Sequence, residues 1–127
     1  MNHQIAPAGI APPGANYAHA VLSEAPARLL HTAGVVPVRP DGTVPDGVGE
    51  QAEVVWANIE AIFGEARMEP TDVVSVTTYV VASEPLAPVM AARDRFLGSH
   101  LAASTLVTVP ALARPEWRVE IAVVAAR

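Results

Sequence analysis

Apolar and polar positions recur along this chain with two different periods, and the change of period marks the expected elements. Over residues 49–66, apolar side chains return every three or four positions while glutamates occupy the opposite side, which predicts an amphipathic helix. After Pro70, the run "DVVSVTTYVVA" is dense in β-branched residues and predicts a central strand. A second three-and-four spacing, in "LAPVMAARDRF", predicts another helix over residues 84–99.

Four further segments have the length and composition of strands, and a short extra strand, not counted in the order below, is expected at the N-terminus, near Ile5. "YAHAVLSE" and "ARLLHTAGVVPV" predict two short strands in a hairpin around Ala25 and Pro26. "STLVTVPAL" and "EWRVEIAVVAA" predict the last two strands, joined across the "ALARPE" loop. Prolines concentrate in the intervening loops, where Asp41-Gly42 and Asp46-Gly47 are the clearest turn signals.

The predicted order is therefore β-β-α-β-α-β-β, with strands alternating with helices in the middle and pairing as hairpins at the ends. An α+β fold with two helices on one face of a single mixed sheet satisfies this order. The other face of that sheet would lie open, although its strands are not clearly polar. Self-association of several copies, each covering the free face of another, is the expected solution.

Composition narrows the class of protein. A chain of 127 residues predicts one domain spanning residues 1–127. The net charge is -5 and the eight basic residues form no run, so nucleic acid is not expected as a partner. No apolar run approaches the roughly 20 residues of a membrane span, and the N-terminus lacks the features of a signal peptide. We therefore expect a soluble, cytoplasmic protein with no membrane partner.

The sequence offers little for metal or thiol chemistry. It has no cysteine, which excludes disulfides and a thiolate nucleophile. The four histidines, at His3, His19, His31 and His100, lack any ligand spacing, so no metal site is expected. The "GVGEQAE" segment before the first predicted helix offers backbone N–H groups to an anion. Acidic residues that suit the helix dipole explain this segment more simply.

Glu120 is the most informative polar residue, because it stands inside the apolar last strand. Burying a carboxylate is costly unless a donor or a cation meets it. Two interpretations stay open at this point. In the structural interpretation, Glu120 is paired with Arg118 or Arg114, or lies open to water at a strand edge. In the functional interpretation, it is a general acid/base that holds a water molecule in a small pocket.

Several segments together resemble the RidA/YjgF family of reactive-intermediate deaminases: "TAGVVPVRPDGTVPDGVGEQAEVVWANIEAIF", "DVVSVTTYVV", "FLGSH", "STLVTV" and "VEIAVVAA". The resemblance covers nearly the whole chain from Tyr17 onward. It implies a chorismate-mutase-like fold and a homotrimer, with sheets lining a central barrel and three clefts between subunits. It further implies hydrolysis of enamines and imines, such as 2-aminoacrylate, to a 2-keto acid and ammonia without metal or organic cofactor.

The resemblance also implies roles for individual residues. The glutamate of the last strand falls on Glu120, which would help to place the attacking water. The tyrosine that walls the cleft falls on Tyr17. The glycine of the turn falls on Gly34, although the serine before it is Ala33 here. Backbone groups near Gly34 and Thr105 would polarise the substrate.

Two positions depart from the family pattern. The arginine that grips the substrate carboxylate is replaced by Ser104, which lacks the charged bidentate grip of a guanidinium. The asparagine of the second helix is replaced by Met90. Arg93 and Arg114 are the candidates to stand in for the missing arginine. Without such a stand-in we expect a neutral or weakly polar substrate and poor turnover of 2-aminoacrylate.

Two functions follow as alternatives. The first is a cofactor-free hydrolase or deaminase of small imines, enamines or related C=N compounds, with Glu120 as the catalytic residue. The second is a non-catalytic trimer that binds a small metabolite or acts as a chaperone-like module. Ribonuclease activity, which some names in the family carry, is not favoured by the acidic charge and the lack of a basic patch.

Overall fold

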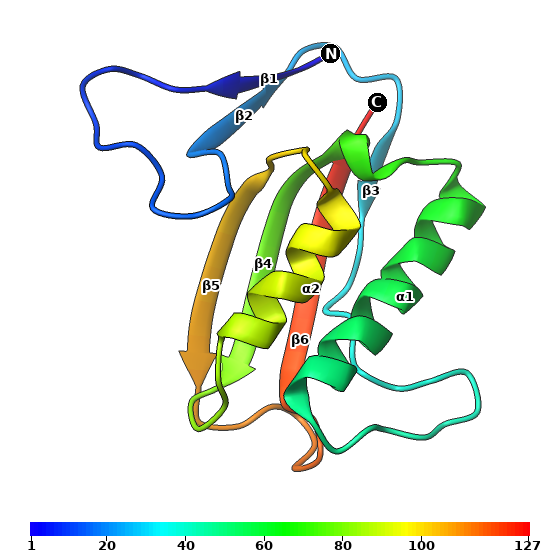
Figure 1. The fold of residues 1–127 in the computed structure, drawn as a ribbon. Helices are drawn as coiled ribbons and strands as arrows, with labels where there is room; N and C mark the ends of the chain where they lie inside the picture. Colours follow the sequence, from blue (N-terminus) through cyan, green and yellow to red (C-terminus); the bar gives the residue numbers. More distant parts are fainter.

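The computed structural model describes residues 1–127 and has two layers, a four-stranded mixed sheet and two helices on one of its faces (Figure 1). The sheet order is β3-β6-β4-β5, and β1 pairs with β2 in a separate ribbon. The predicted α+β fold is therefore confirmed. The strands are β1 (Asn2–Ile5), β2 (Ala20–Ser23), β3 (Leu29–His31), β4 (Val73–Val81), β5 (Ala103–Val109) and β6 (Val119–Ala126); the helices are α1 (Val48–Ala66) and α2 (Ala87–Leu97), with a 3-10 turn at Pro70–Asp72.

Both predicted helices are present near their expected bounds, and α1 ends at a left-handed residue. Arg67 adopts the left-handed conformation, with φ of 55°, and its N–H group donates to the carbonyl of Gly64. Met68 N–H donates to the carbonyl of Phe63, which closes the last turn. The helix thus stops before Pro70, which instead begins the 3-10 turn that leads into β4.

The two predicted hairpins are wrong. β2 does not pair with β3; it pairs with β1, while β3 pairs antiparallel with β6. β5 does not pair with β6 either, because β4 lies between them and is parallel to β5 and antiparallel to β6. The parallel pair needs a crossover connection, which α2 supplies. The pattern of residues correctly predicted that these strands exist. Strands that are adjacent in the sequence, however, are not paired with each other at the two predicted hairpins.

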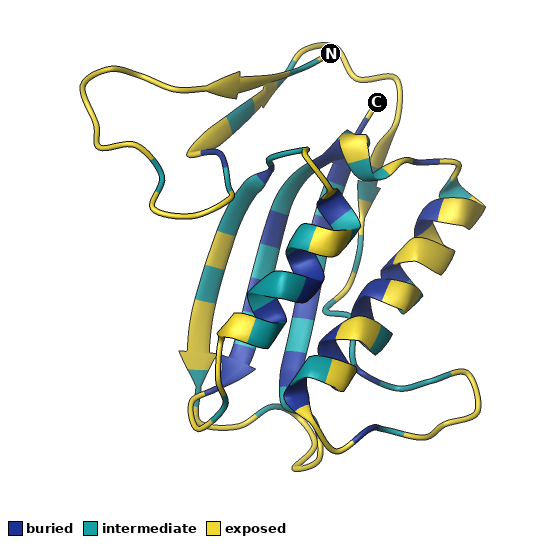
Figure 2. Cartoon of the chain, in the orientation of Figure 1, coloured by how far each residue is buried: buried dark blue, intermediate teal, exposed yellow.

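The core lies between the sheet and the two helices (Figure 2). The stripe predicted on α1 is largely buried, with Val55, Ile59 and Phe63 at 0–1% exposure, but Ile62, which has the same spacing, is 36% exposed. Trp56 stacks on Phe96 of α2 with ring centroids 4.7 Å apart, so an aromatic pair joins the two helices. Neither helix combines the length and the apolar composition that crossing a membrane requires.

The two faces of β6 differ as the period-two pattern predicted. Val119, Ile121 and Val123 point into the core and are fully buried. Glu120 and the residues that alternate with it lie on the face away from the helices, where they are half-buried. No layer of this chain covers that face (Figure 1). The last strand therefore carries Glu120 on the open side of the sheet.

Gln51 of α1 is a fully buried polar residue that ties two loops to the helix layer. Its Nε2 group donates to the carbonyls of Pro45 and Glu116, each at 2.8 Å. Its Oε1 atom accepts a hydrogen bond of 2.7 Å from the backbone N–H of Arg118, next to the start of β6. One amide side chain therefore satisfies three backbone groups at the entrance to the strand that bears Glu120.

We expect Gln51→Met to lower the free energy of unfolding by about 2 kcal/mol, because the buried backbone groups lose their partner while the side-chain volume is kept. Urea unfolding followed by circular dichroism measures this change. Gln4→Met is the matched control, since Gln4 is exposed and makes one hydrogen bond, to the carbonyl of Leu101. Equal stability of the two variants would contradict the role of Gln51 as a clamp.

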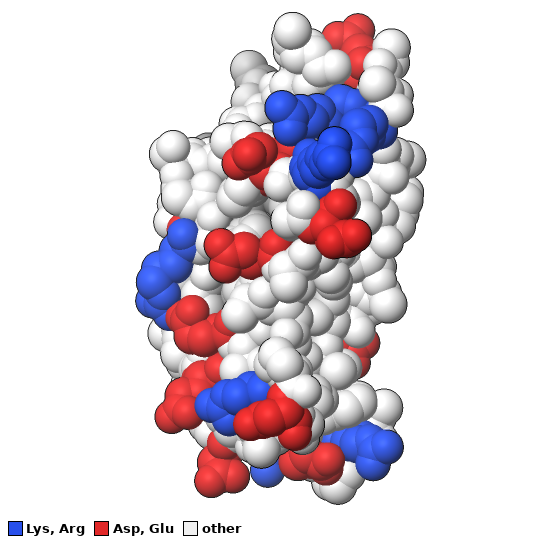
Figure 3. All heavy atoms as spheres, turned by 90° about the vertical axis from the view of Figure 1, so that its right-hand side faces the viewer, with Lys and Arg blue, Asp and Glu red and all other residues white.

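Acidic side chains are spread over the face that bears α1, and one cluster of basic side chains lies near the upper end of this view, with other basic side chains at its left and lower edges (Figure 3). Arg28 donates to the carbonyls of Ala66 and Arg67 at the C-terminus of α1, and Arg127 Nη1 lies 3.5 Å from the same Arg67 carbonyl. Residues far apart in sequence thus bring positive charge to the negative end of the helix dipole. The guanidinium groups of Arg28 and Arg127 thus help to cap the C-terminus of α1.

Candidate functional site

Glu120 and Gly34 meet on the open face of the sheet. Thr32 pairs with Val123 of β6, and Val35 exchanges hydrogen bonds of 2.7 and 3.1 Å with Ile121. The two residues between Thr32 and Val35 therefore stand opposite a single residue of β6, as in a β-bulge. A Cβ atom on Gly34 would lie 2.7 Å from Cδ of Glu120 and would overlap its Oε2 atom. A residue larger than glycine at position 34 would therefore force the Glu120 carboxylate to move.

The ion pairs that the sequence suggested for Glu120 are not formed. Arg118 Nε lies 3.5 Å from Glu84 Oε1, and the Arg114 guanidinium lies 5.9 Å from the ring centroid of Trp117. No cation lies within ion-pair distance of the Glu120 carboxylate, which remains half-buried on the open face. The predicted ion pair is therefore not observed, and β6 is an interior strand, so Glu120 does not lie at a strand edge. A free carboxylate in this position is able to accept a proton or to orient water.

We expect Gly34→Ala to lower the rate of the imine hydrolysis that the family resemblance implies by about 10–100-fold, because the added methyl group displaces the Glu120 carboxylate from its position. The free energy of unfolding should change by less than about 1 kcal/mol, since the backbone of Gly34 is not left-handed and the Glu120 side chain can rotate away. Gly64→Ala is the control, because a Cβ there meets open space. Activity and thermal unfolding are measured on both variants, and full activity of Gly34→Ala would argue against this geometry.

A second group of expected site residues lines a cavity of about 250 Å³ between α2, β5 and the segment before β2. Arg93 is 6% exposed, and its Nη1 group donates to Ser104 Oγ over 3.3 Å. Arg93 belongs to α2 and Ser104 to β5, so the helix supplies a guanidinium beside the serine. The cavity is lined by Ala15, Tyr17, Leu86, Met90, Arg93, Ser104 and Leu106.

Asp94 and Asn16 hold the second group together. The Arg93 Nε group donates to Asp94 Oδ1 at 3.0 Å, and Asn16 Nδ2 donates to Asp94 Oδ2 at 3.1 Å. Arg93 Nη2 lies 2.9 Å from Asp94 Oδ1, yet this buried nitrogen makes no hydrogen bond. The Asp94 carboxylate therefore orients the guanidinium and is ion-paired with it. The same carboxylate anchors the segment that carries Tyr17.

Sequence reasoning missed Asp94 and Asn16. Neighbouring residues on a helix normally face different directions, so nothing in the pattern paired Asp94 with Arg93. Asn16 lies 78 residues away from Asp94, in a proline-rich loop without a periodic pattern. The one usable signal was the polar pair itself, a short run of charge on a helix that otherwise buries Val89 and Ala92.

Of the remaining predicted residues, Thr105 shares the open face with Glu120, Ala33 directly precedes Gly34, and Arg114 lies apart from both groups. Thr105 and Ala33 are exposed, and Thr105 is paired in register with Thr77 of β4. Arg114 lines a different cavity, of about 360 Å³, together with Trp117 and the loop around Gly42. Of the two arginines considered as replacements, the structure therefore brings only Arg93 to Ser104.

Within one chain the predicted site is divided between the two faces of the sheet. Glu120 and Gly34 are on the open face, whereas Tyr17, Arg93 and Ser104 lie on the helix side, at β5. β5 is the edge strand of the sheet, and on its outer side it is bridged only at Ala103, by Ala18 (Figure 1). The two groups therefore do not form one pocket in a single chain.

No three His, Asp or Glu side chains gather into a cluster able to hold a metal ion. Three of the histidines have partners: His3 Nε2 lies 3.0 Å from Glu24 Oε2, and the Nε2 atoms of His19 and His100 each lie 2.7 Å from a carbonyl oxygen, of Ala11 and Val73 respectively. These contacts to carbonyl oxygens hold the imidazole rings of His19 and His100 in place.

Comparisons with known proteins agree with this architecture. A family model described as "Endoribonuclease L-PSP" matches residues 9–127. A protein of unknown function of the conserved Rid family, YyfB from Yersinia pestis, is similar in structure with a TM-score of 0.86 and 32% identity, covering 99% of this chain and 98% of that one.

Two other solved structures are similar over most of their length. TdcF of E. coli, solved with bound serine, has a TM-score of 0.72 and 25% identity and covers 96% of this chain and 93% of that one. RidA from an Antarctic Psychrobacter species has a TM-score of 0.73 and 24% identity, covers 91% and 92% of the two chains, and supports the fold alone. No curated protein matches the sequence. With the family model matching almost the whole chain and a Rid protein nearly one-third identical, this chain belongs to the Rid/YjgF family, the family of the endoribonuclease L-PSP model.

Proposed function

We propose that this protein is a cofactor-free hydrolase of small imines, enamines or related C=N compounds, with Glu120 as the catalytic residue. The observation that carries the proposal is the unpaired Glu120 carboxylate held against Gly34. A carboxylate kept free of cations on a strand of the rigid sheet is suited to general acid/base chemistry on a water molecule. Membership of the Rid/YjgF family supports the same class of reaction.

The proposed reaction needs only water and one proton-transfer group. Water adds to the carbon of the C=N bond and gives one proton to the Glu120 carboxylate. The protonated Glu120 then returns this proton to the nitrogen. In the carbinolamine that results, Glu120 passes the proton of the new hydroxyl group to the nitrogen, the C–N bond breaks as a C=O bond forms, and ammonia and a carbonyl compound leave the site. Backbone N–H groups close to Gly34 would orient the substrate.

Arg93 supports a substrate that carries a carboxylate. The sequence alone predicted a neutral substrate, because Ser104 replaces the family's arginine. A buried guanidinium that is ion-paired with Asp94 and donates to Ser104 at the wall of the cavity favours an acidic group instead. Because this arginine comes from α2 and not from β5, it would hold the carboxylate at a different angle. We therefore keep the prediction that 2-aminoacrylate is a poor substrate.

We further propose that the site is completed between chains of a homotrimer. The division of the predicted residues between two faces supports this assembly, since Glu120 of one copy and the Arg93 cavity of another would then meet at one cleft. The open sheet face and the edge of β5 beyond Ala103 supply surfaces for such contacts. A small metabolite is the expected ligand, and the shortage of basic surface argues against nucleic acid.

A coupled assay for ammonia and keto-acid release tests the proposal. An amino-acid oxidase generates 2-imino acids from acidic, neutral and aromatic amino acids, and an amine oxidase supplies imines without a carboxylate. We expect the protein to accelerate hydrolysis of at least one 2-imino acid and to act less on the imines that lack a carboxylate. Sedimentation of the same preparation should give the mass of three chains. Failure to exceed the spontaneous rate on every imine would overturn the enzymatic proposal.

A non-catalytic binding protein is the second candidate. Ala33 and Ser104 stand where the family pattern has a serine and an arginine, and both replacements remove groups that hold the substrate. The E. coli relative was solved with bound serine, which supports binding of a small amino acid as a function in its own right. Saturable binding of amino or imino acids without turnover would favour this candidate.

A further inference from the structure

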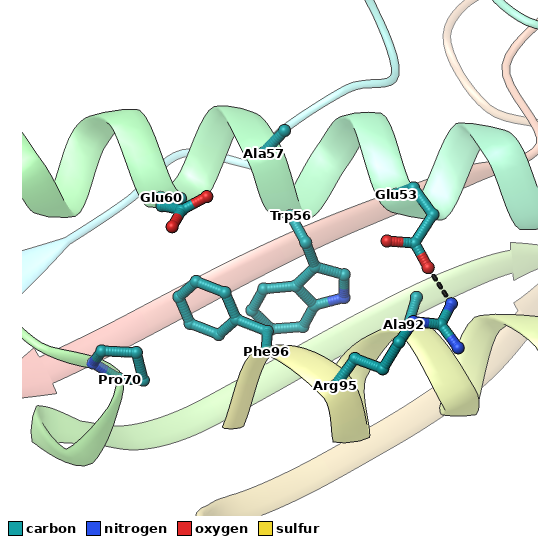
Figure 4. Close-up of a pocket in the computed structure, with 8 residues that line it drawn as sticks. All are labelled: Glu53, Trp56, Ala57, Glu60, Pro70, Ala92, Arg95 and Phe96. Carbon is teal, nitrogen blue, oxygen red and sulfur yellow. Dashed lines mark hydrogen bonds and ion pairs between the residues drawn. The ribbon is translucent and has the colours of Figure 1, made fainter. Parts of the chain in front are cut away.

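A groove on the outer side of the helix layer is not used by the proposed function. It lies between α1 and α2, has a volume of about 300 Å³, and faces away from the open face of the sheet (Figure 4). Its floor is the stacked pair of Trp56 and Phe96. The groove is lined by Glu53, Trp56, Ala57, Glu60, Pro70, Ala92, Arg95 and Phe96.

One polar group in the floor lacks a partner. Trp56 is 3% exposed, and its Nε1–H group makes no hydrogen bond. Leaving a buried indole N–H unpaired is unfavourable. Figure 4 shows this nitrogen on the side of the ring that faces Glu53 and Arg95. The position calls for a hydrogen-bond acceptor at that end of the groove.

Charges of both signs flank the orphan nitrogen. Arg95 Nη2 is ion-paired with Glu53 Oε1 across the groove. Both side chains are about half exposed, at 62% and 49%, so their pair is weak enough for a ligand to replace. A carboxylate between Arg95 and Trp56 would accept from the guanidinium and the indole together. An ammonium group beside it would take over the contact with Glu53.

Glu60 marks the other end of the groove. It is exposed and has no ion-pair partner. Glu53 and Glu60 are seven residues apart, about 10 Å along the same side of α1, with Trp56 between them. Ala57 and Phe96 provide an apolar surface over this distance. The groove therefore presents a dipolar end, an apolar middle and an acidic end.

We propose that this groove binds a basic α-amino acid, of the lysine or ornithine type. The side chains of the groove carry two negative charges and one positive charge, and such a ligand carries the complementary set. A simple anion is disfavoured by the two glutamates. A simple amine leaves the Trp56 N–H group unpaired. A neutral amino acid leaves Glu60 unpaired.

The site is independent of the proposed hydrolysis, and its test needs no enzymatic activity. The chain has two tryptophans, so Trp117→Phe leaves Trp56 as the single fluorescent tryptophan in the groove. This parent protein is titrated with lysine, with norleucine, which lacks the terminal ammonium, and with cadaverine, which lacks the carboxylate. Calorimetry on the same solutions detects binding that leaves the fluorescence unchanged.

We expect saturable binding of lysine with a dissociation constant of about 1 mM or lower, and binding of norleucine and cadaverine about tenfold weaker. Glu60→Gln should weaken lysine about tenfold and leave norleucine unchanged, because it removes only the partner of the terminal ammonium. Arg95→Met should weaken lysine and norleucine alike. Glu65→Gln is the matched control, since Glu65 lies on α1 outside the groove and should have no effect.

Two results would overturn the proposal. One is the absence of saturable fluorescence or heat with lysine at concentrations up to about 10 mM, with native circular dichroism of the parent protein. The other is equal affinity for lysine and norleucine, or equal affinity of the Glu60→Gln and Glu65→Gln variants for lysine. The second result would mean that the ligand does not span the groove between the two glutamates.

Discussion

Glu120→Gln is expected to lower the turnover of imine hydrolysis by about 10²–10⁴-fold, the range typical for loss of a general acid/base. Glutamine keeps the size of the side chain and one carbonyl oxygen, but it cannot accept and return a proton. Because Glu120 has no ion-pair partner, the substitution breaks no ion pair, and the free energy of unfolding should change by less than about 0.5 kcal/mol.

The measurement is the initial rate of ammonia release at saturating 2-imino acid, beside thermal unfolding of each protein. Glu116→Gln is the control, because Glu116 is an exposed glutamate in the loop before β6 and is not part of the site. A Glu120→Gln variant that retains the wild-type rate would show that the carboxylate does not take part in the reaction. Loss of activity together with loss of the fold would point to a structural role.

Arg93→Met is expected to lower kcat/KM for imines that bear a carboxylate by about 100-fold, because it removes the charged donor of the substrate acid. Imines without a carboxylate should be affected little. Methionine preserves the length of the side chain in a position that is 6% exposed, so the packing of α2 on β5 is largely kept. Most of the effect should appear in KM, since the proposed contact holds the substrate before and during the reaction.

Arg114→Met is the comparison that makes the Arg93 test decisive. The sequence left both arginines as replacements for the family's anchor, but Arg114 lies over Trp117 in another cavity. Parallel assays on 2-imino acids and on carboxylate-free imines separate the two. A greater loss of carboxylate selectivity in Arg114→Met than in Arg93→Met would transfer the anchoring role to Arg114.

Local periodicity predicted the elements well because each depends on neighbours in the chain. The stripe of α1 that includes Val55 and Ile59 packs on the sheet as its spacing indicated. The alternation in β6 correctly placed Glu120 on the face opposite Ile121. Strand pairing was not predicted, because the partner of a strand depends on its position in the whole sheet and not on the nearest turn. β6 is an interior strand for this reason, and neither of its neighbours precedes or follows it directly.

The candidate site was predicted in its members more than in its arrangement. Glu120, Gly34, Tyr17 and Ser104 were all expected from the family resemblance, and the structure divides them between two faces of the sheet. Asp94 was missed, since its role depends on contacts with Asn16 that no local pattern contains.

By itself, the sequence determined which segments are helices and strands, which side of each is apolar, and that one carboxylate stands in an apolar strand. Those properties follow from interactions within a few residues. Only the tertiary structure decided that Gly34 meets Glu120 across 86 positions and that Arg93 of α2 reaches Ser104 of β5. Such contacts arise when packing of the helices on the sheet brings distant segments to within a few ångströms, and sequence spacing carries no record of those distances.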